Sequence, residues 1–277
     1  MKRTTTHRLC SRAVIWLLLV ILLSLATRAQ TVTSFNPAIY DDSDEDFSIT
    51  PASQAALGGV LVLDGIDDYA ETADHPELDL AGGSFTVEAW VNFQDLFWEE
   101  VFIKSGAYAL HVERTYSYPT RHDCIGIDYP CGVICCTSSK YLSLGWHHVA
   151  LVYDALAGQA RAYYDGVQRC SATCSASNSD QPLKVGKGIT GNPLEGALDE
   201  MRISSVARYA SAFTPPVGPF ACDGSTRALW HFDEFEGATV FHDACGATDN
   251  LLVGYNGAHT EGVPVHRVYL PLTLKHY

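Results

Sequence analysis

The sequence predicts an all-β protein built as a sandwich of two antiparallel sheets. Its clearest strand runs from Gly145 to Asp154, which is apolar or aromatic at most positions and is bounded by a glycine and a polar loop. The pair Asp165-Gly166 then lies between two β-prone runs and is typical of a tight type I′ hairpin turn. No segment has a long amphipathic helical period, and turn signals recur at intervals of about ten residues, as in sandwiches.

The first 29 residues have the pattern of a secretory signal peptide. Basic residues precede an apolar run at 13–26, and Thr27-Arg28-Ala29 offers small residues for cleavage before Gln30. A retained membrane anchor is the alternative, although the run is short for a membrane span. Cleavage removes five basic residues and no acidic ones, so the formal net charge of −14 becomes more negative by five. Such a chain is a poor partner for nucleic acid or anionic lipid and suits a secreted protein with no membrane span after cleavage.

The mature chain begins with an acidic, polar lead-in at 30–58, including a run of acidic residues at 41–46. We interpret it as a solvated segment, with an acidic ligand site as the alternative. Strands are then expected at 59–65, 69–73, 84–93, 101–104, 108–113, 145–154, 183–186, 196–203 and 227–234. Along 84–93, apolar residues alternate with Thr86, Glu88 and Trp90, so the two sets should face opposite sides of a sheet.

One domain is expected at 59–216, and a C-terminal extension at 217–277 follows a proline-rich break. The extension is too short for an independent core, so its strand is expected to pair back onto the sandwich. Its last β-prone run, at 265–274, is interrupted by Pro271. An edge strand is the simpler interpretation of that run, and a C-terminal sorting signal is the alternative.

Eight of the nine cysteines remain after cleavage, and an even number in an exported chain predicts disulfides. They are Cys124, Cys131, Cys135, Cys136, Cys170, Cys174, Cys222 and Cys245. The first four lie in an irregular insertion at 114–139, which we expect disulfides to brace. We predict the pairs Cys170–Cys174 and Cys222–Cys245, with the first four pairing among themselves. A zinc site at Cys131, Cys135 and Cys136 is the alternative, but adjacent cysteines rarely point at one metal and the compartment is oxidising.

Five segments in the same order resemble the laminin-G-like jelly rolls of the concanavalin A-like lectin and glucanase superfamily. They are Leu63-Asp64-Gly65-Ile66-Asp67-Asp68-Tyr69, Phe85-Thr86-Val87-Glu88-Ala89-Trp90-Val91, Trp146-His147-His148-Val149-Ala150, Tyr164-Asp165-Gly166-Val167 and Leu198-Asp199-Glu200-Met201-Arg202-Ile203. The resemblance covers about 58–216, and 207–234 is similar to the tail of secreted bacterial members. It implies a concanavalin A-like jelly roll of two stacked sheets, in agreement with the strand pattern. The insertion at 114–139 departs from the family pattern.

A structural Ca²⁺ ion is expected as a cofactor, because Asp64, Asp67 and Asp68 surround Gly65 in one loop and calcium binds oxygen ligands. Related jelly rolls often hold calcium between such a loop and a late acidic strand. The resemblance therefore implies Asp199 as a further ligand, with Asp68 or Glu200 as substitutes. Asp199 is then expected to face the sandwich interior, on the side of Met201 and Ile203. Alternatively, Asp64-Gly65 only forms a turn and Asp199 only caps a loop.

Hydrolysis of a glycosidic bond, the reaction of the glucanases, needs two carboxylates about 5–9 Å apart. Glu234 and Glu236 alternate, but the three alternating acids of the glucanase motif do not occur in the sequence. The adjacent acids Asp199 and Glu200 would face opposite sides of a strand. No nucleophile motif is present either. We therefore predict a binding protein and not an enzyme.

Aromatic residues near the insertion are the best candidates for a ligand surface. Rings held on disulfide-braced loops suit both sugar stacking and protein contacts. We predict Trp98, Tyr116, Tyr118 and Tyr129 as ligand-binding residues. The alternative is that these rings cover the small core of their own loop. The sequence thus predicts a secreted, lectin-like module that recognises carbohydrate or a surface protein. The other function classes are a secreted carbohydrate-active enzyme and a structural component of a surface assembly.

Overall fold

The computed structural model describes residues 58–117, 120–188, 193–245 and 250–262. The predicted signal peptide, the lead-in up to residue 57, the last β-prone run and Tyr118 lie outside the described residues. The described chain forms strands β1 to β16 and one short 3₁₀ helix, η1 (Pro76–Leu78). None of its helices is long and apolar enough to cross a membrane.

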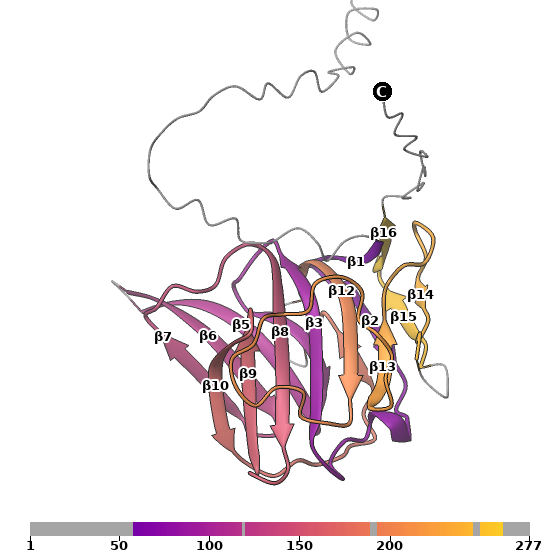
Figure 1. Cartoon of the computed structure of the whole chain (residues 1–277). Helices are drawn as coiled ribbons and strands as arrows, with labels where there is room; N and C mark the ends of the chain where they lie inside the picture. The colour runs from indigo at the N-terminus through magenta and orange to yellow at the C-terminus, as the bar shows by residue number, and fades with distance from the viewer. Residues whose placement is uncertain (1–57, 118–119, 189–192, 246–249, 263–277) are drawn as a thin grey trace, which may run out of the picture. The chain divides into compact units, whose positions relative to one another are not determined.

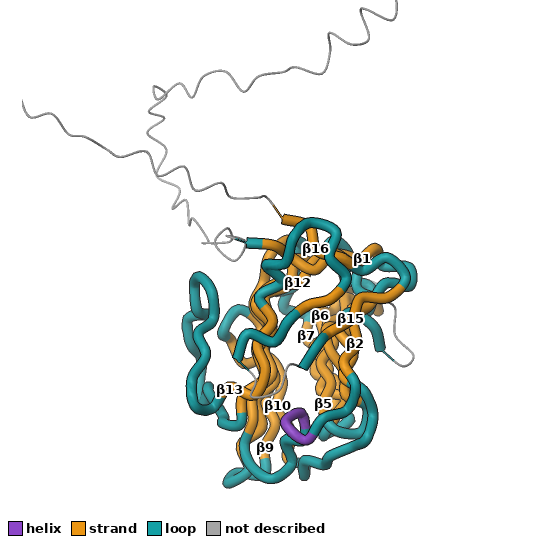
Figure 2. The backbone as a smooth tube through the Cα atoms, turned by 90° about the vertical axis from the view of Figure 1, so that its right-hand side faces the viewer, coloured by secondary structure: helices purple, strands orange, loops and turns teal. Residues whose placement is uncertain are grey.

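The strands form two antiparallel sheets, which confirms the predicted all-β sandwich (Figure 1). Figure 2 shows the sheets edge-on as two layers. Sheet A contains, in spatial order, β10 (Val167–Thr173), β9 (Gln159–Tyr164), β8 (Gly145–Asp154), β3 (Phe85–Phe93), β12 (Glu195–Ser204), β1 (Gly59–Asp64) and β16 (His259–Gly262), and β13 (Thr226–Trp230) also pairs with β12. Sheet B contains β14 (Val240–Phe241), β15 (Leu252–Tyr255), β2 (Tyr69–Thr72), β11 (Leu183–Val185), β4 (Glu99–Lys104), β5 (Tyr108–Ser117), β6 (Thr120–Tyr129) and β7 (Val133–Thr137).

The hydrophobic core lies between the sheets and follows from the alternation of side chains along each strand. In β3, Phe85 and Val87 are buried in the core that both sheets share, whereas Glu88 and Trp90 belong to the opposite face. Burial of one such apolar side chain contributes about 1.5–3 kcal/mol. Asp165 and Gly166 have φ values of 49° and 72°, so the predicted hairpin turn between β9 and β10 is confirmed.

The insertion at 114–139 is regular, in contrast to the prediction. Strand β5 continues to Ser117, and β6 and β7 extend sheet B to its edge. Proline was the misleading signal, because it cannot donate a hydrogen bond to a sheet. Pro119 lies between β5 and β6 in the chain and Pro130 between β6 and β7, so neither occupies a strand.

The disulfides confirm one predicted pair and correct the others. Cys222–Cys245 forms as predicted. The predicted Cys170–Cys174 bond is wrong, because these residues are four apart in extended chain, about 13 Å, and a disulfide requires Cα atoms within about 7 Å. The bonds are instead Cys124–Cys136, Cys131–Cys174 and Cys135–Cys170. The first four cysteines therefore do not pair only among themselves, and none of them is left as a thiolate for zinc.

The C-terminal extension contributes strands to both sheets. β13 pairs with β12 and β16 with β1 in sheet A, while β15 pairs with β2 in sheet B. β13 ends at Trp230, four residues before the predicted end at 234. The chain leaves the sheet there because Phe232 adopts a positive φ of 56° and turns its ring into the core, against Phe241.

Candidate functional site

The outer face of sheet A is covered by the protein's own chain. Residues 205–221 cross this face after β12, as the orange trace in Figure 1 shows. Three of their apolar side chains pack on three from the strands below: Ala207, Tyr209 and Phe213 against Ala150, Val152 and Tyr163. This face is therefore closed to a large ligand.

A buried charge cluster lies beneath the covering segment. The carboxylate of Glu88 is fully buried and accepts hydrogen bonds from Arg202 Nη2 at 2.7 Å and Tyr209 Oη at 2.7 Å, with His148 Nε2 at 3.1 Å. Burial alone would raise the pKa of Glu88, but His148, Arg202 and Tyr209 together lower it to about 2. The hydrogen bond that Tyr209 donates to Glu88 thus holds Tyr209, and with it the covering segment, on sheet A.

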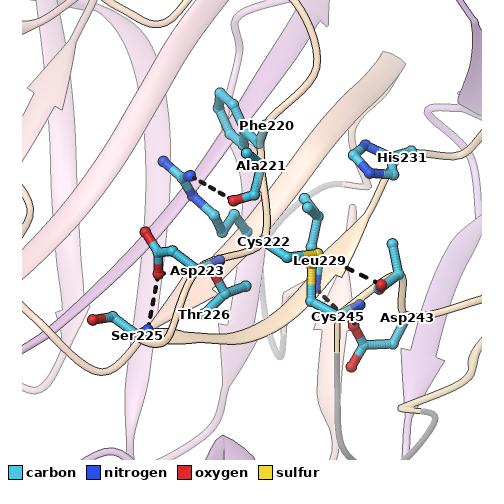
Figure 3. The surroundings of a disulfide bond; sticks show 12 residues. Phe220, Ala221, Cys222, Asp223, Ser225, Thr226, Leu229, His231, Asp243 and Cys245 are labelled. Carbon is cyan, nitrogen blue, oxygen red and sulfur yellow. Dashed lines mark hydrogen bonds between the residues drawn. A yellow bond between two sulfur atoms is a disulfide. The ribbon is translucent and has the colours of Figure 1, made fainter.

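The end of the covering segment is fastened by the Cys222–Cys245 disulfide (Figure 3). Close to it, Asp243 Oδ1 accepts hydrogen bonds from the backbone N–H groups of Leu229 at 3.0 Å and Cys245 at 2.9 Å. Glu200 Oε2 accepts another from Phe220 N at 2.6 Å. The segment is therefore attached through both covalent and polar contacts.

The outer face of sheet B carries a continuous cross-strand row of side chains. Directly paired positions run from β2 to β6 in the order Glu71, Lys184, Ile103, Ala109 and Tyr129. The neighbouring row, Ala70, Val185, Phe102 and Leu110, is buried in the core. Because side chains alternate along a strand, the first row points away from the core.

A pocket of about 230 Å³ opens on this row, with Ile103, Gln181, Lys184 and Gly188 among its lining residues. Beside it, the rings of Tyr69 and Tyr255 stack with centroids 4.9 Å apart. Lys184 Nζ lies 5.2 Å from the Tyr69 ring centroid. The face therefore combines a small concavity, aromatic surface and cationic hydrogen-bond donors.

The three predicted aromatic residues that the structure describes, Trp98, Tyr116 and Tyr129, do not form one platform. Trp98, half-buried before β4, stacks on the imidazole of His111 with ring centroids 4.9 Å apart. Tyr129 is also half-buried and lies in the outer row. Its cross-strand partner on β5 is Ala109, two residues before His111. Tyr116 is 72% exposed near the end of β5, and its position alternates with that of His111, so it faces the other side of the sheet. Trp98 and Tyr129 therefore share the outer face, and Tyr116 does not.

The structure brings three of the five predicted calcium ligands together. Asp64, Asp67 and Asp68 each place a carboxylate oxygen within 4.8 Å of the others. Asp64 Oδ1 also accepts hydrogen bonds from Ile66 N at 2.8 Å and Asp67 N at 3.3 Å, and these bonds lower the pKa of Asp64. Asp68 is 5% exposed, and its Oδ1 has no hydrogen-bond partner among the described residues. Burial, with the charge of Asp64, raises the pKa of Asp68.

Asp199 and Glu200 form a separate cluster. Asp64 pairs with Glu195 across β1 and β12, which leaves Asp199 four residues, or about 13 Å, further along β12. A bulge follows Asp199, with Glu200 at a positive φ of 54°. Asp199 therefore faces outward beside Trp90, not inward with Met201 as the sequence predicted.

The charges around this bulge change the pKa values of two groups. Burial, reinforced by the charges of Glu200 and Asp233, raises the pKa of Asp199 to about 9. His231 Nδ1 lies 2.7 Å from Glu200 Oε1, and this hydrogen bond raises the pKa of His231. The two acids therefore belong to an internal polar network of the C-terminal extension.

Sequence reasoning missed Lys184, Glu100 and His111 on the outer face of sheet B. They lie on β11, β4 and β5, so their proximity depends on the strand order. The available signal was polar residues at alternating positions in strands with an apolar face, which indicates which side faces outward but not which strands are neighbours.

Comparisons with known proteins agree with this architecture. A family model described as the concanavalin A-like lectin/glucanases superfamily matches residues 64–212, more than half of the 277-residue chain. No curated protein matches the chain. A solved structure of a candidate carbohydrate-binding protein from Bacteroides ovatus is similar, with a TM-score of 0.57 and 18% identity over 75% of this chain and 60% of that one. The chain thus spans less than two thirds of that protein's length.

Two further solved structures share less of the fold. IT-sialidase CBM40 from Ruminococcus gnavus, bound to alpha2,3 sialyllactose, has a TM-score of 0.37 and 10% identity over 54% of this chain and 91% of that one. Domains LG4-5 of the mouse laminin alpha1 chain have a TM-score of 0.35 and 13% identity over 60% of this chain and 48% of that one. At these scores the two likenesses support no conclusion about this chain.

Proposed function

This chain belongs to the concanavalin A-like lectin/glucanase superfamily, and we propose that it is a secreted, non-catalytic module that binds carbohydrate through the outer face of sheet B. The observation that carries the proposal is the contrast between the two outer faces. Residues 205–221 cover sheet A, whereas sheet B presents a pocket, aromatic rings and Lys184. The carbohydrate-binding assignment of the Bacteroides ovatus protein favours the same ligand class.

The chemistry of this face suits a sugar. Aromatic rings offer apolar faces on which the C–H groups of a pyranose can stack. Lys184 Nζ, 3.3 Å from Glu71 Oε2, adds a donor and an acceptor side by side for hydroxyl groups. The side chains come from strands, which hold them more rigidly than loops do. The four disulfides support secretion, because disulfides form and persist in the oxidising environment outside the cell.

A glycan array with the full secreted chain tests the proposal. We expect Lys184→Ala and Tyr129→Ala to lose glycan binding while their melting temperatures stay close to that of the wild type. Leu156→Ser, at a fully exposed residue next to β8 in sheet A, is the matched control and should bind normally. Loss of binding in Tyr116→Ala, with binding kept in Lys184→Ala, would move the site to the β5–β6 hairpin and contradict the proposal.

The same preparation distinguishes the other function classes. Release of reducing ends from a polysaccharide would favour an enzyme, and binding only to a surface protein would favour an assembly role. Glu234, the acid considered for hydrolysis, accepts a hydrogen bond from His242 N at 2.7 Å and lies beyond the end of β13. It therefore lacks the alternating strand position that the hydrolytic interpretation required.

We also propose that Asp64, Asp67 and Asp68 bind the predicted calcium ion, without Asp199 or Glu200. Three carboxylates supply hard oxygen ligands, and the buried Asp68 Oδ1, which has no partner among the described residues, fits such a role. An ion at this place would stabilise the β1–β2 turn. It would not bridge the loop to the middle of β12.

A further inference from the structure

A second cluster of metal-ligating side chains lies on the outer face of sheet B. Glu100 of β4 and His111 of β5 are direct cross-strand partners, and Asp128 lies on the adjacent strand β6. One donor atom of each residue lies within 4.8 Å of the donor atoms of the other two. Three neighbouring strands therefore bring a nitrogen ligand and two carboxylates to one point.

Two of the three side chains are buried without full hydrogen bonding. Glu100 is 4% exposed and His111 is 0% exposed. Glu100 Oε1 and His111 Nε2 have no hydrogen-bond partner among the residues that the structure describes. A buried polar group left without a hydrogen-bond partner destabilises the folded state, and two such atoms lie side by side in this cluster. A cation that accepts a lone pair from each would remove this destabilisation.

The imidazole of His111 is oriented in the way that metal ligands are. Its Nδ1 lies 2.6 Å from Asp128 Oδ2, so the Nδ1–H group donates to the carboxylate and Nε2 keeps its lone pair. The stacked ring of Trp98 holds the imidazole from one side. A carboxylate that fixes the tautomer of a histidine is the usual outer support of a metal site.

Two glycines leave the space that the cluster occupies. A Cβ atom on Gly126, the cross-strand partner of His111, would lie 1.9 Å from His111 Cε1. A Cβ atom on Gly188 would lie 2.4 Å from Glu100 Oε2. The backbone thus approaches both groups closely, and any larger residue would displace them.

We propose that Glu100 and His111 Nε2 bind a first-row transition metal ion such as Zn²⁺, with Asp128 as the outer carboxylate that holds the imidazole. Imidazole nitrogen with carboxylate oxygen is a zinc donor set, whereas Ca²⁺ prefers about six to eight oxygen ligands. The site shares no residue with the aspartate loop at Asp64. The metal proposal can also be tested independently of the proposed sugar binding, because metal binding is measured without any glycan.

Titration of the full secreted chain, purified without a histidine tag and treated with a chelator, tests this site. We expect one Co²⁺ ion per chain to give a visible d–d absorption band and to quench the fluorescence of Trp98, whose ring lies on His111. Zn²⁺ should displace Co²⁺ and raise the melting temperature, since a ligand that binds only the native state stabilises it.

Variants assign the signal to its residues. Glu100→Gln keeps the shape of the side chain and should weaken Co²⁺ binding by roughly 10–100-fold or more, as should His111→Gln. Trp98→Phe should remove the quenching but keep the absorption band. The Asp64→Asn/Asp67→Asn variant is the matched control and should bind Co²⁺ like the wild type. Wild-type affinity in Glu100→Gln, loss of binding only in the aspartate-loop variant, or no saturable binding at millimolar Co²⁺ would each overturn the proposal.

Discussion

Cys135 of β7 and Cys170 of β10 join the edge strand of sheet B to the edge strand of sheet A. Cys131 and Cys174 form a second link of the same kind, each four residues from its neighbour in the first link. One side of the sandwich is therefore closed by two covalent bonds between the sheets. The insertion that departs from the family pattern carries half of these cysteines.

The two inter-sheet bonds should be nearly redundant. Removing either Cys135–Cys170 or Cys131–Cys174 with paired serines should have a small effect, because the remaining bond still closes nearly the same loop. Removing both should cost about 4 kcal/mol, as expected for a separation of 43 residues. Urea unfolding of the three variants without reductant would measure this.

The hairpin bond provides the comparison for that experiment. Cys124–Cys136 spans 12 residues of paired strands, so its removal should cost less than the loss of both inter-sheet bonds. If the losses of unfolding free energy on removing each inter-sheet bond alone added up to the loss on removing both, the two bonds would not be redundant.

Stability should fall in acid because of Glu88. The folded-state pKa of this carboxyl is about 2, below the ordinary value of 4.5, so its contribution is complete above pH 4.5 and is lost as pH falls towards 2. The loss should amount to about 3 kcal/mol. Urea unfolding of Glu88→Gln between pH 6 and 3 should show a flatter pH dependence, with lower stability at pH 6 because Arg202 keeps a buried charge. An unchanged slope would show that other carboxylates dominate.

Asp199→Asn should stabilise the protein at alkaline pH. The folded-state pKa of Asp199 is about 9 and its ordinary value is 3.8, so its contribution is complete below pH 3.8 and is lost as pH rises towards 9. An amide is neutral at every pH and needs no proton to be buried. The free energy of unfolding of the variant should therefore exceed that of the wild type by at least about 1 kcal/mol at pH 8 and by almost nothing at pH 4. Thermal unfolding at both pH values measures the gain, and Asp180→Asn, at an exposed position, is the control.

Gly126→Ala should disturb the Glu100–His111–Asp128 cluster. Its methyl group would overlap the imidazole of His111 at 1.9 Å, so the ring must move and the free energy of unfolding should fall by about 1–3 kcal/mol. Co²⁺ absorption should weaken in parallel. Gly82→Ala, where a Cβ meets no atom within 4 Å, is the matched control and should change neither quantity.

Calcium should stabilise the wild-type chain, and Asp68→Asn should abolish this effect. Excess calcium at about 100 times its dissociation constant would add about 2.7 kcal/mol relative to a chelator. Differential scanning calorimetry with calcium or chelator measures the shift. Asp199→Asn should keep the calcium response, because Asp199 lies about 13 Å from the loop along β12. Loss of the response in Asp199→Asn would restore the ligand set that the sequence implied.

The sequence could predict the elements whose signals are local. Period-two alternation identified β3 and its core face, and Asp165-Gly166 identified a turn, because such a pair tolerates positive φ without a contribution from the rest of the fold. The grouping of Asp64, Asp67 and Asp68 was local in the same sense, since all three lie in one loop. The sandwich class followed from these patterns.

Only the tertiary structure decided which distant residues meet. Cys170 pairs with Cys135 and not with Cys174, because the strand order sets β10 beside β7. The bulge after Asp199 turned that side chain outward, and the strand order of sheet B brought Glu100, His111 and Lys184 to one face. Alternation states which side of a strand is buried, but the neighbour across a sheet depends on long-range pairing, which leaves no mark in the local sequence.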